Sequence, residues 1–217
     1  SDEIIDCCSK NGYKIIDFDD KAYPKRLKEI INPPAVLYVD GELPDIDNLV
    51  CIGMVGTRKA SEYAIKAAHI MAKGITEAGA LVVSGGALGI DTYSHLGALA
   101  CGGKTVAVLG NGLGNNYLKA NEGLRNMIKQ SGALVTEYQP NVPANRTSFP
   151  MRNRIISGLS LGILVVEAGV KSGSLITANL AIEQNRDVYA VPASIFSSDF
   201  SGTNKLISDG ARLAINP

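Results

Sequence analysis

Short runs of apolar residues alternate with longer segments of helical periodicity from about residue 49 onward. The apolar runs are continuous, which is typical of strands buried on both faces of a parallel sheet. The longer segments repeat apolar residues three and four positions apart, as an amphipathic helix does. The pattern predicts strands at residues 49–55, 80–83, 104–109, 133–136, 162–166 and 188–191, and helices at residues 61–78, 89–101, 117–130, 152–161, 174–184 and 203–209.

This alternation predicts an α/β fold with an open, doubly wound, mainly parallel sheet of the Rossmann-like type. A closed (β/α)8 barrel would need more strands and usually more residues. The first part of the chain differs, because residues 1–45 hold many charges, the pair Pro33-Pro34, one predicted strand at 35–39 and a predicted turn at Asp40-Gly41. We expect residues 1–45 to be a lead-in segment packed on the core, and residues 46–217 to form the Rossmann-like domain.

Composition narrows the class of protein. The 217 residues carry a formal net charge of +0, so a nucleic-acid site must come from local clustering of cations. No run of about 18 apolar residues is present, and the acidic, polar start lacks a signal-peptide pattern, so we expect a cytoplasmic protein without a membrane span. His69 and His95 are expected to be structural, and no metal site is predicted. The cysteine spacing fits no zinc site and indicates free thiols: Cys7, Cys8, Cys51 and Cys101.

A glycine-rich segment, residues 84–91, follows the predicted strand at 80–83 and precedes a predicted helix. Glycine lets the main chain approach an anion closely, and a helix N-terminus adds unpaired N–H groups and a partial positive charge. The segment therefore indicates a ligand that carries phosphate, which could be a nucleotide, a nucleic acid or another phosphate-bearing compound.

Four further strand ends carry glycine, hydroxyl or basic residues, and ligands of open α/β sheets bind at this edge. Arginine can grip phosphate with two hydrogen bonds, and an aromatic ring beside cations suits base stacking. Core packing remains an alternative for Phe149, and an ion pair at a helix start remains one for Arg152 and Arg154. The candidate binding residues are Gly56, Thr57, Arg58, Lys59, Gly85, Gly86, Arg146, Ser148, Phe149, Arg152, Asn153, Arg154, Lys171, Ser172, Gly173 and Ser174.

Other common phosphate and catalytic motifs are absent from the sequence. No GxGxxG opens a helix after the first core strand, and neither a GxxxxGK[ST] loop nor a GxSxG elbow occurs. Asp91 stands at a helix start, where it is expected to hold the glycine loop through backbone N–H groups. Glu137 and Glu167 end strands and are the remaining acid–base candidates, so no catalytic residue is assigned.

With these residues placed, the chain resembles the DNA-processing protein A family (DprA, also called Smf) over nearly its whole length. The matching motifs occur in order: Gly56-Thr57-Arg58, Ser84-Gly85-Gly86-Ala87 with Gly89-Ile90-Asp91, Ser148-Phe149-Pro150 with Arg152-Asn153-Arg154, Glu167-Ala168 with Ser172-Gly173-Ser174, and Gly202-Thr203-Asn204.

The resemblance implies a protein that binds single-stranded DNA and helps to load RecA recombinase onto it in natural transformation or recombination. It also implies a homodimer. We expect no cofactor and no enzymatic activity. By motif, Arg58 would contact backbone phosphate, and Phe149 would stack on a base with Arg146 nearby. Gly85, Gly86 and the residues around Ser172 would border the bound DNA strand. The helical N-terminal module and the C-terminal winged helix that many members carry are not in this sequence.

A second class of protein has a related fold. The lysine-decarboxylase-like phosphoribohydrolases cleave nucleoside monophosphates and carry a catalytic Glu in a Pro-Gly-Gly-x-Gly-Thr-x-x-Glu signature. When Gly173-Ser174 is laid on the Gly-Thr of that signature, Thr177 takes the place of the Glu. A threonine cannot serve as the carboxylate that this chemistry needs, so the binding function is favoured over the enzyme.

Overall fold

The structure is a computed structural model that describes residues 2–217. Helices and strands alternate through most of the chain. The helices are α1 (Asp2–Asn11), α2 (Lys25–Lys28), α3 (Glu62–Glu77), α4 (Ile90–Ala100), α5 (Glu122–Ser131), α6 (Ser148–Leu159), α7 (Ser174–Glu183) and α8 (Ser201–Ser208). The strands are β1 (Lys14–Asp17), β2 (Val36–Gly41), β3 (Cys51–Val55), β4 (Leu81–Ser84), β5 (Thr105–Val108), β6 (Ala133–Thr136), β7 (Gly162–Val165), β8 (Asp187–Ala190) and β9 (Arg212–Leu213).

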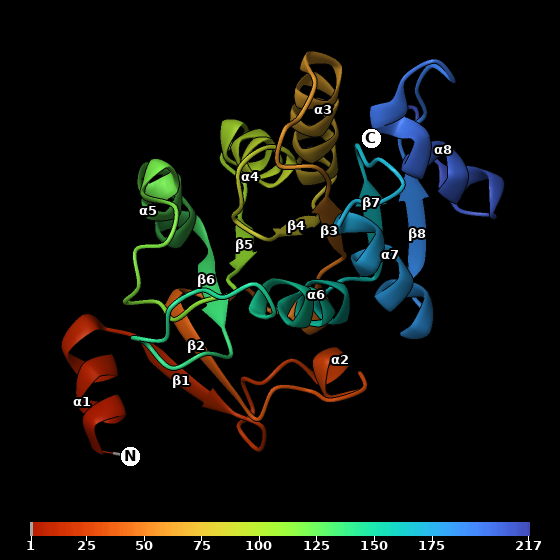
Figure 1. Cartoon of the computed structure of the whole chain (residues 1–217). Coiled ribbons are helices and arrows are strands. Elements are labelled where there is room, and N and C mark those ends of the chain that lie inside the picture. Colours follow the sequence, from red (N-terminus) through yellow and green to blue (C-terminus); the bar gives the residue numbers. More distant parts are fainter. Residues whose placement is uncertain (1) are drawn as a thin grey trace.

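The strands of residues 2–217 form one 9-stranded sheet in the order β1-β2-β6-β5-β4-β3-β7-β8-β9. The seven strands from β6 to β9 in this order are parallel, whereas β2 runs antiparallel to both β1 and β6. Helices α3, α4 and α5 cover one face of the sheet, and α6 and α7 cover the other (Figure 1). The predicted open, doubly wound, mainly parallel sheet is therefore confirmed.

Successive side chains of the central strands pack into opposite halves of the core. In β7, Ile163 belongs to the apolar cluster under α6 and α7, whereas Leu164 belongs to the cluster under α3. The same alternation places Val83 of β4 in the first cluster and Val82 in the second. Both faces of the sheet need apolar residues for this reason, which explains why the strands are continuous apolar runs.

The winding of the sheet changes direction at β3, which lies between β4 and β7. Strands β4, β5 and β6 extend the sheet to one side of β3, and α6 then returns the chain across the opposite face to β7 (Figure 1). The loops after β3 and β7 diverge at such a point and leave a crevice, which is where open α/β sheets bind ligands.

Several predicted boundaries differ from the structure, and three of the differences have a physical cause in the residues involved. Gly41 is not in a turn but pairs with Ala133 at the end of β2, and its φ of 100° brings it against the carbonyl oxygen of Gly132. Helix α6 starts at Ser148, because Pro150 is tolerated in a first helical turn, where its missing N–H costs nothing. Helix α5 starts later than predicted, after Leu118 in a left-handed conformation with φ 59°.

The segment before β3 supplies an edge of the same sheet and part of the core. Strands β1 and β2 extend the sheet beyond β6, and neither β1 nor α1 and α2 was predicted. The Tyr23 hydroxyl donates a hydrogen bond to Pro34 O at 2.6 Å, and the buried Leu27 packs in the cluster with Ile155 and Leu159 of α6. The segment is thus anchored by apolar contacts from α2 and by strand pairing from β2.

His95 is a buried structural residue of α4, as the sequence predicts. The Thr105 hydroxyl donates its one proton to Val82 O at 2.8 Å, so it accepts from Nδ1–H of His95, also at 2.8 Å. The other ring nitrogen, Nε2, is buried without a partner among the described residues. Burial, with a smaller contribution from the charge of Arg152, lowers the pKa of His95 to about 3.

The His95→Leu substitution should reduce the acid sensitivity of the fold. The unfolded chain protonates this histidine below pH ~6.5 whereas the folded chain does not, so its contribution is lost as the pH falls from about 6.5 towards about 3. We expect the wild type to lose about 2–3 kcal/mol through this group between pH 7.5 and pH 4.5. Urea unfolding at both pH values measures the difference, which should shrink in His95→Leu. The control His69→Leu leaves His95 in place and should keep the wild-type difference. Equal losses in all three proteins would contradict this account.

Candidate functional site

A pocket of about 670 Å³ lies at the carboxyl ends of β3 and β7, at the point where the sheet reverses its winding. We call it the switch-point pocket. It is lined by the loop after β3, the start of α4, the first turns of α6 and the loop before α7. Ten predicted residues line it: Gly56, Thr57, Arg58, Arg146, Phe149, Arg152, Asn153, Ser172, Gly173 and Ser174.

Six predicted residues do not line the switch-point pocket, for different reasons. Lys59 and Lys171 are exposed on the flanking loops, whereas Gly85, Gly86 and Ser148 are buried. Arg154 points to the other side of α6 and forms an ion pair there. Contact of these sixteen residues with a ligand stays a prediction.

One wall of the pocket is aromatic. The half-buried ring of Phe149 lies 5.3 Å from that of Tyr117, measured between ring centroids, with an angle of 43° between the rings. The backbone of Gly110 supports the Phe149 ring so closely that a Cβ atom at this glycine would lie 2.9 Å from Cδ1 of Phe149. The Arg58 guanidinium carbon lies 4.8 Å from the centroid of the Phe149 ring, in a cation–π contact.

Another part of the lining carries hydroxyl groups at the start of α7. The Oγ atoms of Ser172 and Ser174 are 2.8 Å apart, and α7 begins at Ser174. The dipole of α7 favours negative charge at this end, while the N–H groups of Leu175 and Ile176 donate to Ser172 O at 3.1 Å and to Gly173 O at 3.2 Å. Arg146 is exposed and lines the same pocket, so the lining as a whole includes a cation, two hydroxyls and a helix end.

The glycine loop after β4 is a buried support of the pocket. Asp91 is buried and accepts a hydrogen bond from the Ala87 N–H at 3.2 Å, which confirms that it holds the shape of this loop. Asn121 donates from Nδ2 to the carbonyl oxygens of Gly86 and Ala87, both at 3.2 Å. The chain then enters α4 beside the loop after β3. Ile90, the first residue of α4, donates its N–H to Thr57 O in that loop at 3.1 Å. Gly89, with φ 77°, allows this close approach.

Arg152 is a buried cation that joins the loop to α6. It is 4% exposed, and its Nη1 donates to Gly85 O at 2.6 Å and also to Val108 O at the end of β5. Burial raises the pKa of Asp91, and the positive charge of Arg152 opposes that rise. Burial likewise lowers the pKa of Arg152, which the charge of Asp91 opposes. Each charge therefore compensates the desolvation of the other.

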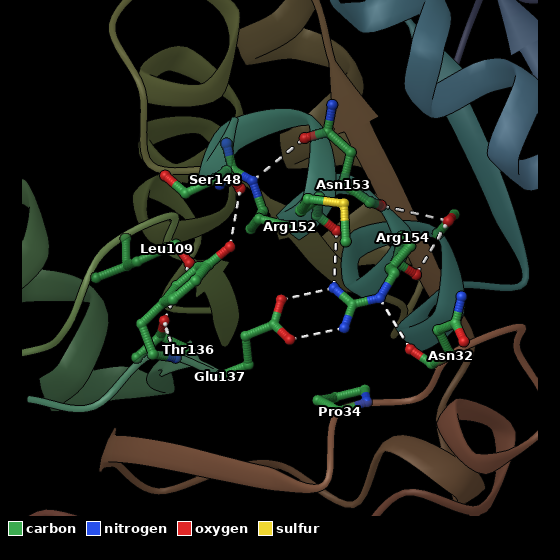
Figure 2. Close-up of polar contacts among 12 residues, drawn as sticks. Asn32, Pro34, Leu109, Thr136, Glu137, Ser148, Arg152, Asn153 and Arg154 are labelled. Atoms are coloured by element: carbon green, nitrogen blue, oxygen red, sulfur yellow. Dashed lines mark hydrogen bonds and ion pairs between the residues drawn. The ribbon is translucent and has the colours of Figure 1, made fainter. Parts of the chain in front are cut away.

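Arg154 holds the lead-in segment against α6 (Figure 2). Its Nη1 and Nη2 each donate to one carboxylate oxygen of Glu137 at 2.6 Å, and its Nε donates to Asn32 O at 2.9 Å. The ion pair proposed as an alternative for this arginine is therefore present. Glu137, one of the two acid–base candidates, is occupied by the same pair.

Glu167, the other acid–base candidate, lies outside the switch-point pocket. It is 1% exposed, and its Oε2 accepts a hydrogen bond from the Ser61 N–H at 2.9 Å, at the start of α3. Burial raises the pKa of this carboxyl group. Among residues 2–217, Asp91 is the one carboxylate that lines the pocket. The position where the phosphoribohydrolase signature has its Glu is held by Thr177, which is 1% exposed.

Sequence reasoning missed Tyr117, Asn121 and the role of Gly110. Tyr117 was placed at the start of a helix, but it lies in the irregular segment before α5, where its ring reaches the pocket. An aromatic residue shortly after the glycine-rich stretch at 110–114 was the available signal. Gly110 and Phe149 are far apart in sequence, so no local pattern indicated their contact.

The part of the chain that the structure describes holds no group of three or more His, Cys, Asp or Glu residues placed to bind a metal ion. It also contains no helix that is both long and apolar enough to span a membrane. All four cysteines are free thiols.

The fold and the pocket define the class of protein: a Rossmann-like α/β domain with an arginine- and aromatic-lined pocket at the switch point of its sheet. The family model of the DNA recombination-mediator protein A matches residues 14–217. The chain belongs to this family.

Individual relatives agree with this assignment. The chain is 40% identical over 203 residues to the DNA processing protein DprA of Bacillus subtilis (strain 168), a match that covers 94% of this chain and 68% of the relative. The X-ray structure of DNA processing protein A from Streptococcus pneumoniae superposes with a TM-score of 0.91 at 38% identity, over 98% of this chain and 75% of that one. A structure of DNA processing protein A from Helicobacter pylori, described for its single-stranded DNA binding mode, superposes with a TM-score of 0.85 at 29% identity. The match covers 94% of this chain and 91% of that one.

The Gly85→Ala substitution should destabilise the protein, because the site depends on close packing at this glycine. A Cβ atom there would lie 2.4 Å from Oδ2 of Asp91 and 2.6 Å from Nη1 of Arg152, both of them buried. We expect a loss of about 1–3 kcal/mol in the free energy of unfolding, measured by urea denaturation. The control is Gly123→Ala on the exposed face of α5, where no atom lies within 4 Å and a gain of about 0.5–1 kcal/mol is expected. A Gly85→Ala protein as stable as the wild type would contradict the tight packing.

Proposed function

We propose that this domain binds single-stranded DNA in the switch-point pocket and along its rim. The observation that carries the proposal is the contact of Arg58 with Phe149, because a guanidinium suits phosphate and the neighbouring ring suits base stacking. Arg146 and the serines before α7 supply further groups for the backbone. The Helicobacter pylori relative, described as binding single-stranded DNA, supports the proposal.

The grip is tolerant of sequence. Every base has a π face, so stacking on Phe149 gives about 1–3 kcal/mol per base with little preference among bases. Arginine contacts to phosphate carry no sequence information, and they weaken as salt rises because counterions are released on binding. Since the formal net charge is +0, the salt dependence comes from the cations at the pocket rim.

We assign no catalytic step to the pocket. Its carboxylate, Asp91, is bound to the Ala87 N–H and lies beside Arg152, so it is poorly placed to accept a proton from a substrate. Thr177 supplies no carboxylate. Release of free base from nucleoside monophosphates, followed by chromatography, would contradict this assignment and favour the phosphoribohydrolase.

Exchange of the rim arginines should weaken DNA binding and reduce its salt dependence. We expect Arg58→Ala combined with Arg146→Glu to lower the affinity for a single-stranded oligonucleotide at least tenfold at about 0.1 M salt. Each lost phosphate contact should reduce the slope of log K against log salt by about 0.7. Fluorescence anisotropy at several salt concentrations measures both quantities. Arg212→Glu, an exposed arginine on β9, is the matched control. A folded double variant with wild-type affinity would place the DNA elsewhere.

Phe149→Ala should act differently from the arginine variants. Removal of the ring leaves the cations in place, so the affinity should fall by about 1–3 kcal/mol while the salt slope stays near that of the wild type. The same anisotropy titrations separate the two effects, and thermal unfolding checks that the variant folds. An unchanged affinity would mean that Phe149 serves packing alone.

We further propose that the protein acts as a homodimer in the cytoplasm and helps RecA to replace other proteins on single-stranded DNA. Family membership supports this role. In the test, RecA is added to DNA coated with single-strand-binding protein, and filament growth is measured by the ATPase rate. We expect this protein to shorten the lag, and the Arg58→Ala, Arg146→Glu variant to shorten it less. An unchanged lag would contradict the RecA role, and a monomeric mass by light scattering would contradict the dimer.

A further inference from the structure

Arg58 stands in a segment without regular secondary structure. It lies between the end of β3 and the start of α3, in residues 56–61, which we call the Arg58 loop. Its side chain is exposed, yet its guanidinium carbon lies 4.8 Å from the centroid of the Phe149 ring. Fixing an irregular backbone in one conformation costs entropy, so contacts to the loop must offset that cost if Arg58 is to stay at the ring.

One residue holds both ends of the Arg58 loop. Glu167 lies just after β7, and its main-chain oxygen accepts a hydrogen bond from the Thr57 N–H at 2.9 Å. Its side-chain Oε2 accepts another from the Ser61 N–H, also at 2.9 Å. The first bond continues the pairing of β3 with β7, so any residue could make it. The second bond needs a side chain that ends in an acceptor, and this bond closes the loop.

The start of α3 does not by itself explain the buried carboxylate. Ser61 already caps this helix with its own hydroxyl, which accepts a hydrogen bond from the Ala64 N–H at 3.2 Å. Glu167 is 1% exposed, and its other oxygen, Oε1, has no partner among residues 2–217. Burial with so few partners is unfavourable for a carboxylate and raises its pKa. Groups held at such a cost are typical of functional sites.

We propose that Glu167 is a positioning residue for DNA binding, whose carboxylate closes the Arg58 loop and holds the guanidinium beside the Phe149 ring. The other side of the loop is fixed as well, because Ile90 donates its N–H to Thr57 O at 3.1 Å. Glu167 does not line the switch-point pocket, so its effect on a ligand passes through Arg58. The inference rests on the proposed function and adds to it a residue that touches no DNA.

Two substitutions separate the reach of the side chain from its charge. Glu167→Gln keeps an oxygen for the Ser61 N–H, and its amide nitrogen replaces Oε1, which has no partner to lose. Glu167→Asp keeps the charge but is one methylene shorter, so its oxygens fall short of the Ser61 N–H. Positioning predicts that Glu167→Gln keeps its affinity for a single-stranded oligonucleotide within about twofold, whereas Glu167→Asp loses at least threefold. A charge effect predicts tighter binding by Glu167→Gln and little change in Glu167→Asp.

A double-mutant cycle tests whether the loss passes through Arg58. In the Arg58→Ala background, Glu167→Asp should cost no further affinity, because the group that it positions is gone. In the wild-type background it should also reduce the slope of log K against log salt by about 0.7, the share of one phosphate contact. Fluorescence anisotropy measures both quantities. The matched control is Asp47→Ala, which removes a carboxylate that accepts from the Lys25 N–H at 2.8 Å, at the start of α2 and outside the pocket lining. It should leave the affinity unchanged.

The position of Arg58 can also be measured without DNA. The ring current of Phe149 should move the NMR signals of the Arg58 side-chain protons upfield in the wild type and in Glu167→Gln. This shift should disappear in Glu167→Asp. Phe149→Ala identifies the shifted signals, and thermal unfolding checks that each variant is folded.

Three results would overturn the inference and leave the proposed function standing. The first is a Glu167→Asp protein with wild-type affinity and an intact Arg58 shift. The second is an equal loss from Glu167→Asp with and without the Arg58 side chain, and the third is a folded Glu167→Gln protein that has lost its affinity. Failure of the wild type to bind the oligonucleotide would instead contradict the proposed function, and the NMR shift would still decide whether Glu167 positions Arg58.

Discussion

The buried guanidinium of Arg152 is the interaction on which the rest of the site depends. It joins the ends of β4 and β5 to α6 through the carbonyl oxygens of Gly85 and Val108. A buried charge of this kind is costly unless it is paired and hydrogen-bonded, and Asp91 together with these carbonyls meets that cost. Asp91 in turn shapes the glycine loop, so one network fixes three elements around the pocket.

The cations of the site fall into two groups, according to whether partners within the chain hold them. Arg152 and Arg154 hold the fold together. Arg152 donates to the carbonyl oxygens of Gly85 and Val108, and Arg154 forms an ion pair with Glu137 (Figure 2). Arg58 and Arg146 are exposed at the pocket and have charge to offer a ligand. The exposed arginines are therefore the ones for which phosphate binding is proposed.

The hydrophobic pattern was sufficient for the fold but not for every element. Continuous apolar strands such as β6 were predicted with their observed bounds, because burial on both faces leaves a strong signal. Strand β1 was not predicted, because it is an edge strand in which only Ile16 is buried and the apolar signal is weak. The hydrophobic pattern was likewise informative for only part of the site. Arg152 stands three and four residues before Ile155 and Ile156, on the buried face of α6, and this spacing was the available sign that it is internal.

Periodicity and local motifs were enough to establish the alternation of strands and helices, the edge of the sheet that carries the site, and the family to which the chain belongs. Each of these properties depends on residues that are neighbours in the sequence. The folded chain alone reveals which arginines are free, that Tyr117 and Gly110 complete the aromatic wall, and that Glu137 and Glu167 are structural. These outcomes depend on contacts between segments far apart in sequence, where the cost of burying a charge, and not a local pattern, selects the partner.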